Sequence, residues 1–245
     1  MNNKHDMIFL LPCFSGGGAE RVTINLLIGL HNLNYNVGII VFNKSGPLLS
    51  MLSNNIPIYD LERHTLKSSI VPLIRQLRRL NPKVIFSTLG YINVLILAMR
   101  WFLPKKIKIW IREANIPSIS LPNNNRPKIM AFLYKMLYNK SDKLICTSTR
   151  MKDEFILNFL VPESIIEILP NPVDVKVIRD SILTVERFDK GGVSYITAGR
   201  LVYQKGFDRL LYWFSKLNDR QSTLTILGEG VLKNELMRES ELLGL

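Results

Sequence analysis

Short apolar runs alternate with helical segments along most of this chain of 245 residues. Most runs are continuous in apolar residues and only a few residues long, which is typical of strands that are buried on both faces. Parallel strands need a crossover between them, so the alternation predicts an α/β fold with a doubly wound parallel sheet. The predicted strands are residues 7–12, 37–42, 56–61, 84–88, 107–112, 144–148, 165–169, 193–198 and 224–227. The predicted helices are one that follows the first strand and ends near Leu30, and residues 70–80, 92–102, 127–138, 150–159, 206–217 and 231–243.

A segment with two prolines, Asn171-Pro172-Val173-Asp174, interrupts this pattern, and polar residues follow it as far as Gly192. We therefore predict an N-terminal domain over residues 1–170, an interdomain linker over residues 171–192 and a C-terminal domain over residues 193–245. A doubly wound domain usually has roughly five or six strands, whereas this last part has only two predicted strands. We expect the second domain to be incomplete, with an exposed sheet edge and exposed apolar helix faces.

The net charge of +12 is concentrated in one part of the chain. Residues 63–152 contain 18 Lys and Arg residues but only two acidic residues, Glu113 and Asp142. Such a block predicts an anionic partner, either a membrane surface or a nucleic acid, unless it is merely a solvated basic face. No nucleic-acid-binding motif accompanies the charge, so a nucleic-acid partner is not expected.

Several classes of protein are excluded by other features. A hydrophobic content of 47% argues against general disorder. The longest apolar run, residues 92–99, is far shorter than the ~18 residues that suggest a membrane span, and Met1–Asp6 is polar and gives no signal peptide. The two cysteines, Cys13 and Cys146, fall at apolar strand positions without metal-ligand spacing, which predicts reduced, buried thiols in a cytosolic protein.

Neither a Ser–His–Asp nor a Cys–His arrangement is visible in the sequence. The three histidines, His5, His31 and His64, are scattered, so no metal site and no histidine base are predicted. The segment Arg112-Glu113-Ala114-Asn115 follows the end of a predicted strand, where active-site groups gather in parallel sheets. Glu113 could orient the hydroxyl group of an acceptor there, or it could simply pair with Arg112.

Two cations mark the loop after the first predicted strand of the C-terminal domain. Residues 193–198 lead into Gly199-Arg200-Leu201, and a predicted helix starts just after Lys205. Arg200 and Lys205 would therefore lie where free N–H groups and the helix dipole favour an anion. The loop predicts a site for a phosphate or diphosphate group, unless it is an ordinary solvated basic loop.

A glycine run, Gly16-Gly17-Gly18, lies between the first predicted strand and the first predicted helix. Glycines let the backbone approach a ligand closely and can present N–H groups to a phosphate. The run is not the dinucleotide-binding fingerprint, because Arg21 stands where the third glycine belongs, and no Gly-Lys-Ser/Thr follows as in a P-loop. The alternative is a plain tight turn.

Four segments resemble the motifs of one enzyme family, the retaining, nucleotide-sugar-dependent glycosyltransferases of family 4. They are Phe14–Arg21, Ile168–Asp174, Gly199–Asp208 and Gly228–Gly230. Each segment alone is weak evidence, but together they fall in the family's order at compatible spacing. The resemblance runs from about residue 7 to the end of the chain.

The resemblance implies a GT-B fold, in which two Rossmann-like domains with doubly wound parallel sheets face each other, the second being incomplete here. It implies transfer of a sugar, with retention, from a UDP- or GDP-linked donor to a glycan or lipid-linked acceptor in cell-surface polysaccharide biosynthesis. No metal and no further cofactor are implied. By motif match, the candidate catalytic residues at the donor diphosphate are Arg200 and Lys205. Glu113, from its place after the end of a predicted strand, is the candidate catalytic residue on the acceptor side. The implied donor-binding residues are Gly16, Gly17, Gly18, Arg200, Lys205, Gly228 and Gly230.

The chain departs from the family pattern in two places. It ends before the paired-glutamate motif whose second Glu holds the donor ribose, so the chain by itself could be inactive. Arg112-Glu113 stands where many members carry a histidine, which leaves the catalytic role of this position open. The alternatives are a non-catalytic anion-binding module for membrane or nucleic acid, and a nucleotide-sugar epimerase of the same two-domain shape.

Family members that build cell-surface glycans often use lipid-linked acceptors at the cytoplasmic face of the membrane. The resemblance therefore implies a cytoplasmic enzyme that is peripheral at the inner face of the cell membrane. Basic and aromatic side chains of the basic block could dock there on anionic lipid. These residues are Arg75, Arg78, Arg79, Lys105, Lys106 and Lys108, with Trp101 and Phe102 nearby.

Overall fold

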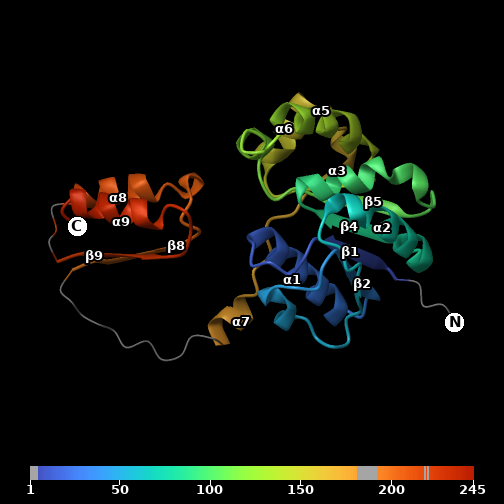
Figure 1. Cartoon of the computed structure of the whole chain (residues 1–245), viewed down its shortest axis with the longest axis horizontal. Coiled ribbons are helices and arrows are strands. Elements are labelled where there is room, and N and C mark those ends of the chain that lie inside the picture. Colours follow the sequence, from blue (N-terminus) through green and yellow to red (C-terminus); the bar gives the residue numbers. More distant parts are fainter. Residues whose placement is uncertain (1–4, 181–191, 218, 220) are drawn as a thin grey trace. The chain divides into compact units, whose positions relative to one another are not determined.

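The computed structural model describes residues 5–180, 192–217, 219 and 221–245. The chain forms two compact units, Met1–Ile178 (unit 1) and Arg179–Leu245 (unit 2), both of which are drawn in Figure 1. In each unit parallel strands alternate with helices, as the sequence predicts.

Unit 1 contains a seven-stranded parallel sheet with the strand order β3-β2-β1-β4-β5-β6-β7. Every strand predicted for this part of the chain is present, and its ends lie within two residues of the predicted ends. The strands are β1 (Met7–Leu11), β2 (Val37–Val41), β3 (Ile58–Asp60), β4 (Val84–Thr88), β5 (Lys108–Arg112), β6 (Lys143–Cys146) and β7 (Ile166–Ile168).

The helices up to residue 180 include two short ones that the sequence did not predict, α4 and α7. Helices of four and six residues carry too little periodic pattern to be recognised. Where the sequence predicted one helix over residues 92–102, the structure has α3 followed by the 3₁₀ turn η2. The helices are α1 (Gly18–Asn32), α2 (Leu66–Leu80), α3 (Gly90–Ala98), α4 (Pro117–Ser120), α5 (Pro127–Leu137), α6 (Thr149–Phe159) and α7 (Val175–Asp180). The 3₁₀ turns are η1 (Pro47–Met51), η2 (Arg100–Phe102), η3 (Tyr138–Lys140) and η4 (Glu163–Ile165).

Alternate residues of the unit 1 strands enter two different cores. In β1, Ile8 and Leu10 belong to the core shared with α2, α3, α5 and α6, whereas Phe9 and Leu11 belong to the core shared with α1 and η1. Figure 1 shows α1 on one side of the sheet and α3, α5 and α6 on the other. Because both faces are covered, β2 is buried at every position, which explains its continuous apolar run.

The strand order of unit 1 reverses between β1 and β4. Strands β2 and β3 lie on one side of β1, and β4 to β7 lie on the other. Helices α1 and α3 consequently start beside each other, each after the carboxyl end of a central strand. The crevice at such a switch point is the usual ligand site in open α/β sheets.

The described residues of unit 2 form two parallel strands, β8 (Ser194–Ala198) and β9 (Thr223–Leu227), with α8 (Phe207–Ser215) and α9 (Lys233–Leu242) on one face (Figure 1). Both strands alternate between half-buried and exposed residues, and Ile196 is 72% exposed. The prediction of a buried strand over residues 193–198 is therefore wrong, because α8 and α9 cover only one face of the sheet. Apolar surface remains exposed in this unit, as expected.

A hollow of about 1240 Å³ lies in unit 2. Apolar side chains of the small core line it, among them Leu211, Leu224 and Leu236. It is the loosely filled interior of a two-layer unit, and its lining does not single out a polar ligand.

Candidate functional site

The loop after β1 carries the predicted glycine run. Gly17 is the N-cap residue of α1, and Gly18 begins the helix. The carboxylate of Glu20 folds back over Gly17 and accepts a hydrogen bond of 2.8 Å from the Ser15 hydroxyl. A Cβ atom at position 17 would lie 2.2 Å from Oε2 of Glu20. Because this carboxylate ends a flexible side chain that can shift, the contact by itself does not require glycine at position 17.

The segment after β2 supports the glycine loop. The Phe14 amide donates to the Ser45 carbonyl at 2.8 Å, and the Leu48 amide donates to the Phe14 carbonyl at 3.1 Å. Gly46 has a φ of 121°, and a Cβ atom there would lie 2.2 Å from the Phe14 carbonyl oxygen. Because only glycine fits this close approach, the loop that bears Gly16–Gly18 rests on a fixed support.

The turn between β4 and α3 lies beside the glycine loop. Burial raises the pKa of Tyr91 to about 12, and the nearby charge of Glu20 adds to this shift. Leu89 adopts the left-handed region (φ 75°), which is rare for a residue other than glycine. The following residue, Gly90, leaves room for Tyr134, whose hydroxyl oxygen would lie 1.8 Å from a Cβ atom at position 90. This turn thus brings the start of α3 against α5.

Glu113 follows β5 and is only 4% exposed. The Asn93 side chain donates to its Oε1 at 2.8 Å, and the Tyr138 hydroxyl donates to the same oxygen. The Tyr134 hydroxyl also hydrogen-bonds the Glu113 carboxyl group. The rings of Tyr134 and Tyr138 stack with centroids 4.2 Å apart, and Tyr138 stacks on Phe155 at 5.4 Å. Three elements, α3, α5 and η3, therefore hold one buried carboxyl group.

Burial raises the pKa of Glu113 to about 7, although hydrogen bonds from Tyr138, Asn93 and Tyr134 and the charge of Arg112 oppose the shift. The same environment raises the pKa of Tyr138, chiefly by burial and also because a phenolate there would lie beside the carboxylate. A carboxyl group that titrates near neutral pH is suited to accept or donate a proton in a reaction.

Arg112 points away from Glu113, and no ion pair joins these two described residues. Arg112 is 1% exposed, and its Nη2 donates to the side-chain oxygen of Asn171 while Nη1 donates to Thr88 Oγ1 at 3.4 Å. Burial lowers the pKa of Arg112, and the nearby charge of Glu113 opposes this effect. The interpretation of Glu113 as a simple partner of Arg112 is therefore wrong. Arg112 instead links the end of β5 to the proline-flanked segment at residue 171.

A pocket of about 120 Å³ opens beside Glu113. Tyr91 belongs both to this pocket and to the surroundings of the glycine loop, so the two predicted features of unit 1 are neighbours. No cluster of three His, Cys, Asp or Glu side chains that could hold a metal ion occurs in the described residues. The polar side chains that line the pocket are Tyr91, Glu113, Asn115, Ser120, Asn124 and Tyr134.

In unit 2, the loops after β8 and β9 are in close backbone contact and are joined by a hydrogen bond. The Leu201 amide donates to the Glu229 carbonyl at 2.9 Å. Cβ atoms at Gly228 and Gly230 would lie 1.8 Å from the Gly199 carbonyl oxygen and 2.3 Å from the Leu201 carbonyl oxygen. The contact between the two loops thus requires both glycines, whatever the loops bind.

Arg200 and Lys205 are exposed in the loop between β8 and α8. Gly206, the N-cap residue of α8, takes up the left-handed conformation (φ 67°) that lets the chain turn into the helix. Among the described residues, no acidic side chain pairs with either cation. Such cations beside the start of a helix suit an anion, but their joint use with the glycine loop and Glu113 of unit 1 stays a prediction.

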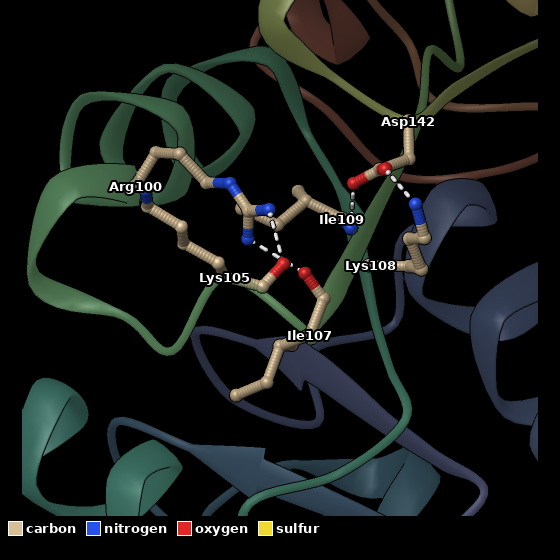
Figure 2. Close-up of polar contacts among 6 residues, drawn as sticks. All are labelled: Arg100, Lys105, Ile107, Lys108, Ile109 and Asp142. Carbon is tan, nitrogen blue, oxygen red and sulfur yellow. Dashed lines mark hydrogen bonds and ion pairs between the residues drawn. The ribbon is translucent and has the colours of Figure 1, made fainter.

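Some cations of the basic block form hydrogen bonds and ion pairs within the block itself. They lie near the amino end of β5, at the edge of the sheet opposite to the pocket. The Arg100 guanidinium donates to the carbonyl oxygens of Ile107 at 2.6 Å and Lys105 at 3.0 Å (Figure 2). Figure 2 also shows the ion pair between Lys108 and Asp142, at 2.9 Å. Arg100 and Lys108 therefore have structural partners and are not simply available to a ligand.

The aromatic residues of the same surface are strongly exposed. Trp101 and Phe102 are 86% and 56% exposed, and Arg78 Nε donates to the Phe102 carbonyl at 2.7 Å. Lys105 and Lys106 are exposed beside them. None of the helices in the described ranges has the length and apolar character needed to cross a lipid bilayer.

Sequence reasoning did not single out Asn93, Tyr134 and Tyr138, which complete the surroundings of Glu113. A signal for them exists, because Tyr134 and Tyr138 recur at a helical spacing of four residues and Asn93 is a polar residue within an apolar run.

The prediction that both cysteines are buried thiols is only partly correct. Cys146 is buried in β6, and burial raises its pKa to about 12, but Cys13 follows the end of β1 and is only half-buried.

Residues 16–177 match the family described as Glycosyltransferase Family 4. The match begins at the glycine run and includes the carboxyl-edge loops of the sheet as far as α7.

A curated relative from Campylobacter jejuni is 30% identical to this chain over 239 residues. It is an N-acetylgalactosamine-N,N'-diacetylbacillosaminyl-diphospho-undecaprenol 4-alpha-N-acetylgalactosaminyltransferase. The similar region covers 90% of this chain and 62% of the relative, so the chain spans less than two thirds of that relative's length.

Solved structures of similar fold include Anabaena HepE in complex with UDP, with a TM-score of 0.73 and 15% identity over 98% of this chain and 66% of that chain. A glycosyltransferase from Rickettsia africae gives a TM-score of 0.71 and 18% identity over 99% of this chain and 66% of that chain. At such low identity the likeness concerns the fold alone, and it confirms the predicted GT-B fold class.

Proposed function

This chain belongs to glycosyltransferase family 4, and from that premise we propose that it transfers a sugar from a nucleotide-sugar donor to a lipid-linked acceptor. The product would be a bacterial cell-surface glycan, and the enzyme would work at the cytoplasmic face of the membrane. The observation that carries this proposal is the 30% identity to a transferase whose acceptor is linked to diphospho-undecaprenol. The aligned region includes both units, so it contains the donor loop as well as the pocket beside Glu113.

The exposed cations of unit 2 suit the departure of the nucleoside diphosphate. When the anomeric bond breaks, negative charge grows on the leaving phosphate oxygen. Arg200 and Lys205, next to the start of α8, would stabilise this charge without a metal ion. Because neither cation is paired with an acidic side chain of the described residues, both are available to the donor diphosphate. The clasped loops at Gly199 and Gly228 would hold the backbone close to the nucleotide.

The pocket of unit 1 suits the acceptor. Its lining presents hydroxyl and amide groups, which can hydrogen-bond a sugar, and Glu113 lies at its wall. With a pKa of about 7, Glu113 could take up the proton of the acceptor hydroxyl or orient that hydroxyl for attack. Gly16 to Gly18 would let the backbone of the neighbouring loop approach the donor sugar. Retention of the anomeric configuration is part of this proposal.

The test is sugar transfer by the full-length protein from radiolabelled UDP- or GDP-sugars to polyprenyl-diphosphate-linked acceptors. We expect Lys205→Ala to lower turnover roughly a hundredfold, because a group that stabilises charge in the transition state contributes about 3 kcal/mol. Lys216→Ala removes an equal charge at the far end of α8 and should leave turnover unchanged, while circular dichroism confirms that both variants fold. Unchanged turnover of Lys205→Ala would contradict the proposal that Lys205 binds the donor diphosphate.

The family match favours transfer over the two other functions considered. A non-catalytic anion-binding module would bind anionic polymers or vesicles without consuming a nucleotide sugar. An epimerase would interconvert the donor sugar without an acceptor. Release of nucleoside diphosphate only when the acceptor is present distinguishes the transferase from both.

A further inference from the structure

The outer face of α5 carries an apolar stripe bordered by cations. Ile129, Phe132 and Met136 are 51%, 62% and 50% exposed, and their spacing of three and four residues places them on one side of the helix. Lys128 and Lys135 are exposed and lie two turns apart in the row next to this stripe. A helix on the surface of a globular protein normally turns polar residues to water, so this outer face is unusual.

The inner face of the same helix is part of the candidate site. Tyr134 is 4% exposed, hydrogen-bonds Glu113 and stacks on Tyr138. Its ring also packs near Phe155 and Phe159 of α6, with centroid distances of 6.3 Å and 5.7 Å. Because aromatic packing fixes α5 on the core, the outer stripe is held rigidly relative to the pocket beside Glu113.

The charges around α5 indicate what covers the stripe. No acidic residue occurs in the sequence between Glu113 and Asp142. Among the described residues, no acidic side chain pairs with Lys128 or Lys135, whereas Lys108 of the opposite edge is paired with Asp142 (Figure 2). Cations without acidic partners beside exposed apolar side chains are complementary to a surface that is anionic outside and apolar beneath.

We propose that α5 docks unit 1 on an anionic phospholipid surface. Ile129, Phe132 and Met136 enter the boundary between headgroups and acyl chains, and Lys128 and Lys135 contact the lipid phosphates. Helices with one apolar face and flanking Lys or Arg residues lie in the plane of the membrane interface in this way. Docking through α5 brings the pocket beside Glu113 close to the membrane, where a lipid-linked acceptor is presented. This last consequence rests on the proposed function, but membrane binding itself does not.

The test is sedimentation of the full-length protein with vesicles of phosphatidylcholine mixed with phosphatidylglycerol. Each Lys near an anionic surface contributes roughly fivefold to the partition coefficient, so Lys128→Glu combined with Lys135→Glu should lower binding at least ~25-fold. Phe132→Ser combined with Met136→Ser should lower it roughly tenfold through lost apolar burial. High salt should weaken the binding of the wild-type protein to these vesicles, and the protein should bind poorly to vesicles of pure phosphatidylcholine.

The matched control is Lys216→Glu combined with Arg238→Glu, which makes the same change in net charge at exposed positions of unit 2. We expect it to change binding less than about threefold, because local cations at the docking face dominate the attraction. An equal loss in this control would overturn the assignment to α5, as would wild-type protein that does not prefer anionic vesicles. A stable dimer that Phe132→Ser converts to monomers would overturn it too, since a second copy would then cover the stripe.

Activity separates this proposal from the proposed function. The α5 variants should transfer sugar normally to a water-soluble acceptor analogue but poorly to an acceptor embedded in vesicles. Wild-type protein that binds anionic vesicles through α5 but transfers sugar to neither acceptor would count against the proposed function and leave docking supported. Thermal melts of each variant show whether the fold is retained, as expected for exposed positions.

Discussion

The sheets of the two units start from the same local pattern and reach different degrees of burial. β2 of unit 1 is buried at every position, whereas β8 of unit 2 alternates between half-buried and exposed residues. β2 lies between β1 and β3 with layers on both faces, while β8 pairs with β9 in the described residues and has helices on one face. The burial of a strand is therefore set by its neighbouring strands and by the layers that cover the sheet, and its own apolar run does not determine it.

The candidate site residues show the same contrast. Glu113 in unit 1 is enclosed by donors from three elements, which is why its pKa can be far from the usual value. Arg200 and Lys205 in unit 2 are exposed in an open loop. A side chain enclosed by packed layers is therefore preorganised before a ligand binds. Exposed side chains in an open loop supply charge, but their positions are fixed only when the ligand binds.

The largest difference between the two units is expected when one buried leucine in each is truncated to alanine and the loss in free energy of unfolding is compared. Leu10→Ala in β1 should lower the free energy of unfolding of unit 1 by about 3–5 kcal/mol, because Leu10 is 0% exposed between covered layers. Leu211→Ala in α8 should cost unit 2 only about 2 kcal/mol, because its small core can relax around the cavity. Hydrogen exchange followed by mass spectrometry gives the opening free energy of each unit separately. Equal losses would contradict the comparison.

The second test uses the pH dependence of the free energy of unfolding that follows from the burial of Glu113. Glu113 has a pKa of about 7 in the folded protein against an ordinary value of 4.5, so the folded state holds its proton more tightly. Stability should therefore fall as the pH rises from about 4.5 to 7, by about 3 kcal/mol in total. Glu113→Gln cannot ionise, and the difference between its unfolding free energy and that of the wild type should follow this curve in denaturant titrations. A pH-independent difference would show that the carboxyl group is not enclosed.

The smallest expected effect concerns the open face of unit 2. Ile196→Thr in β8 should change the free energy of unfolding of unit 2 by less than about 0.5 kcal/mol, because Ile196 is 72% exposed. The matched change Ile39→Thr in β2 buries a hydroxyl group in a fully covered strand and should cost unit 1 about 2 kcal/mol or more. Urea denaturation of both variants measures the two values. A large loss for Ile196→Thr would show that another part of the protein covers this face.

Local pattern predicted most of the elements, because strands and helices have periodicities that a few consecutive residues reveal. Every predicted strand exists, and the helices at 127–138 and 150–159 are present with ends shifted by at most one residue, whereas the helix predicted at 70–80 begins four residues earlier, at Leu66. The short helices α4 and α7 escaped prediction, since neither is long enough to show a period. The resemblance carried by the four motif segments also led to the family that the comparisons establish.

The alternation of strands and helices can be read from the sequence, and it places the glycine run and Glu113 at the carboxyl edge of the unit 1 sheet and the Arg200 loop at the carboxyl edge of the unit 2 sheet. Within each parallel sheet all strands have their carboxyl ends on the same side, so this placement needs no knowledge of long-range contacts. Tertiary contacts, by contrast, are what hold Glu113 with Tyr134 and Tyr138, turn Arg112 to Asn171 and leave one face of β8 exposed. These outcomes depend on residues far apart in the chain and on how many layers pack together, and no local period encodes either.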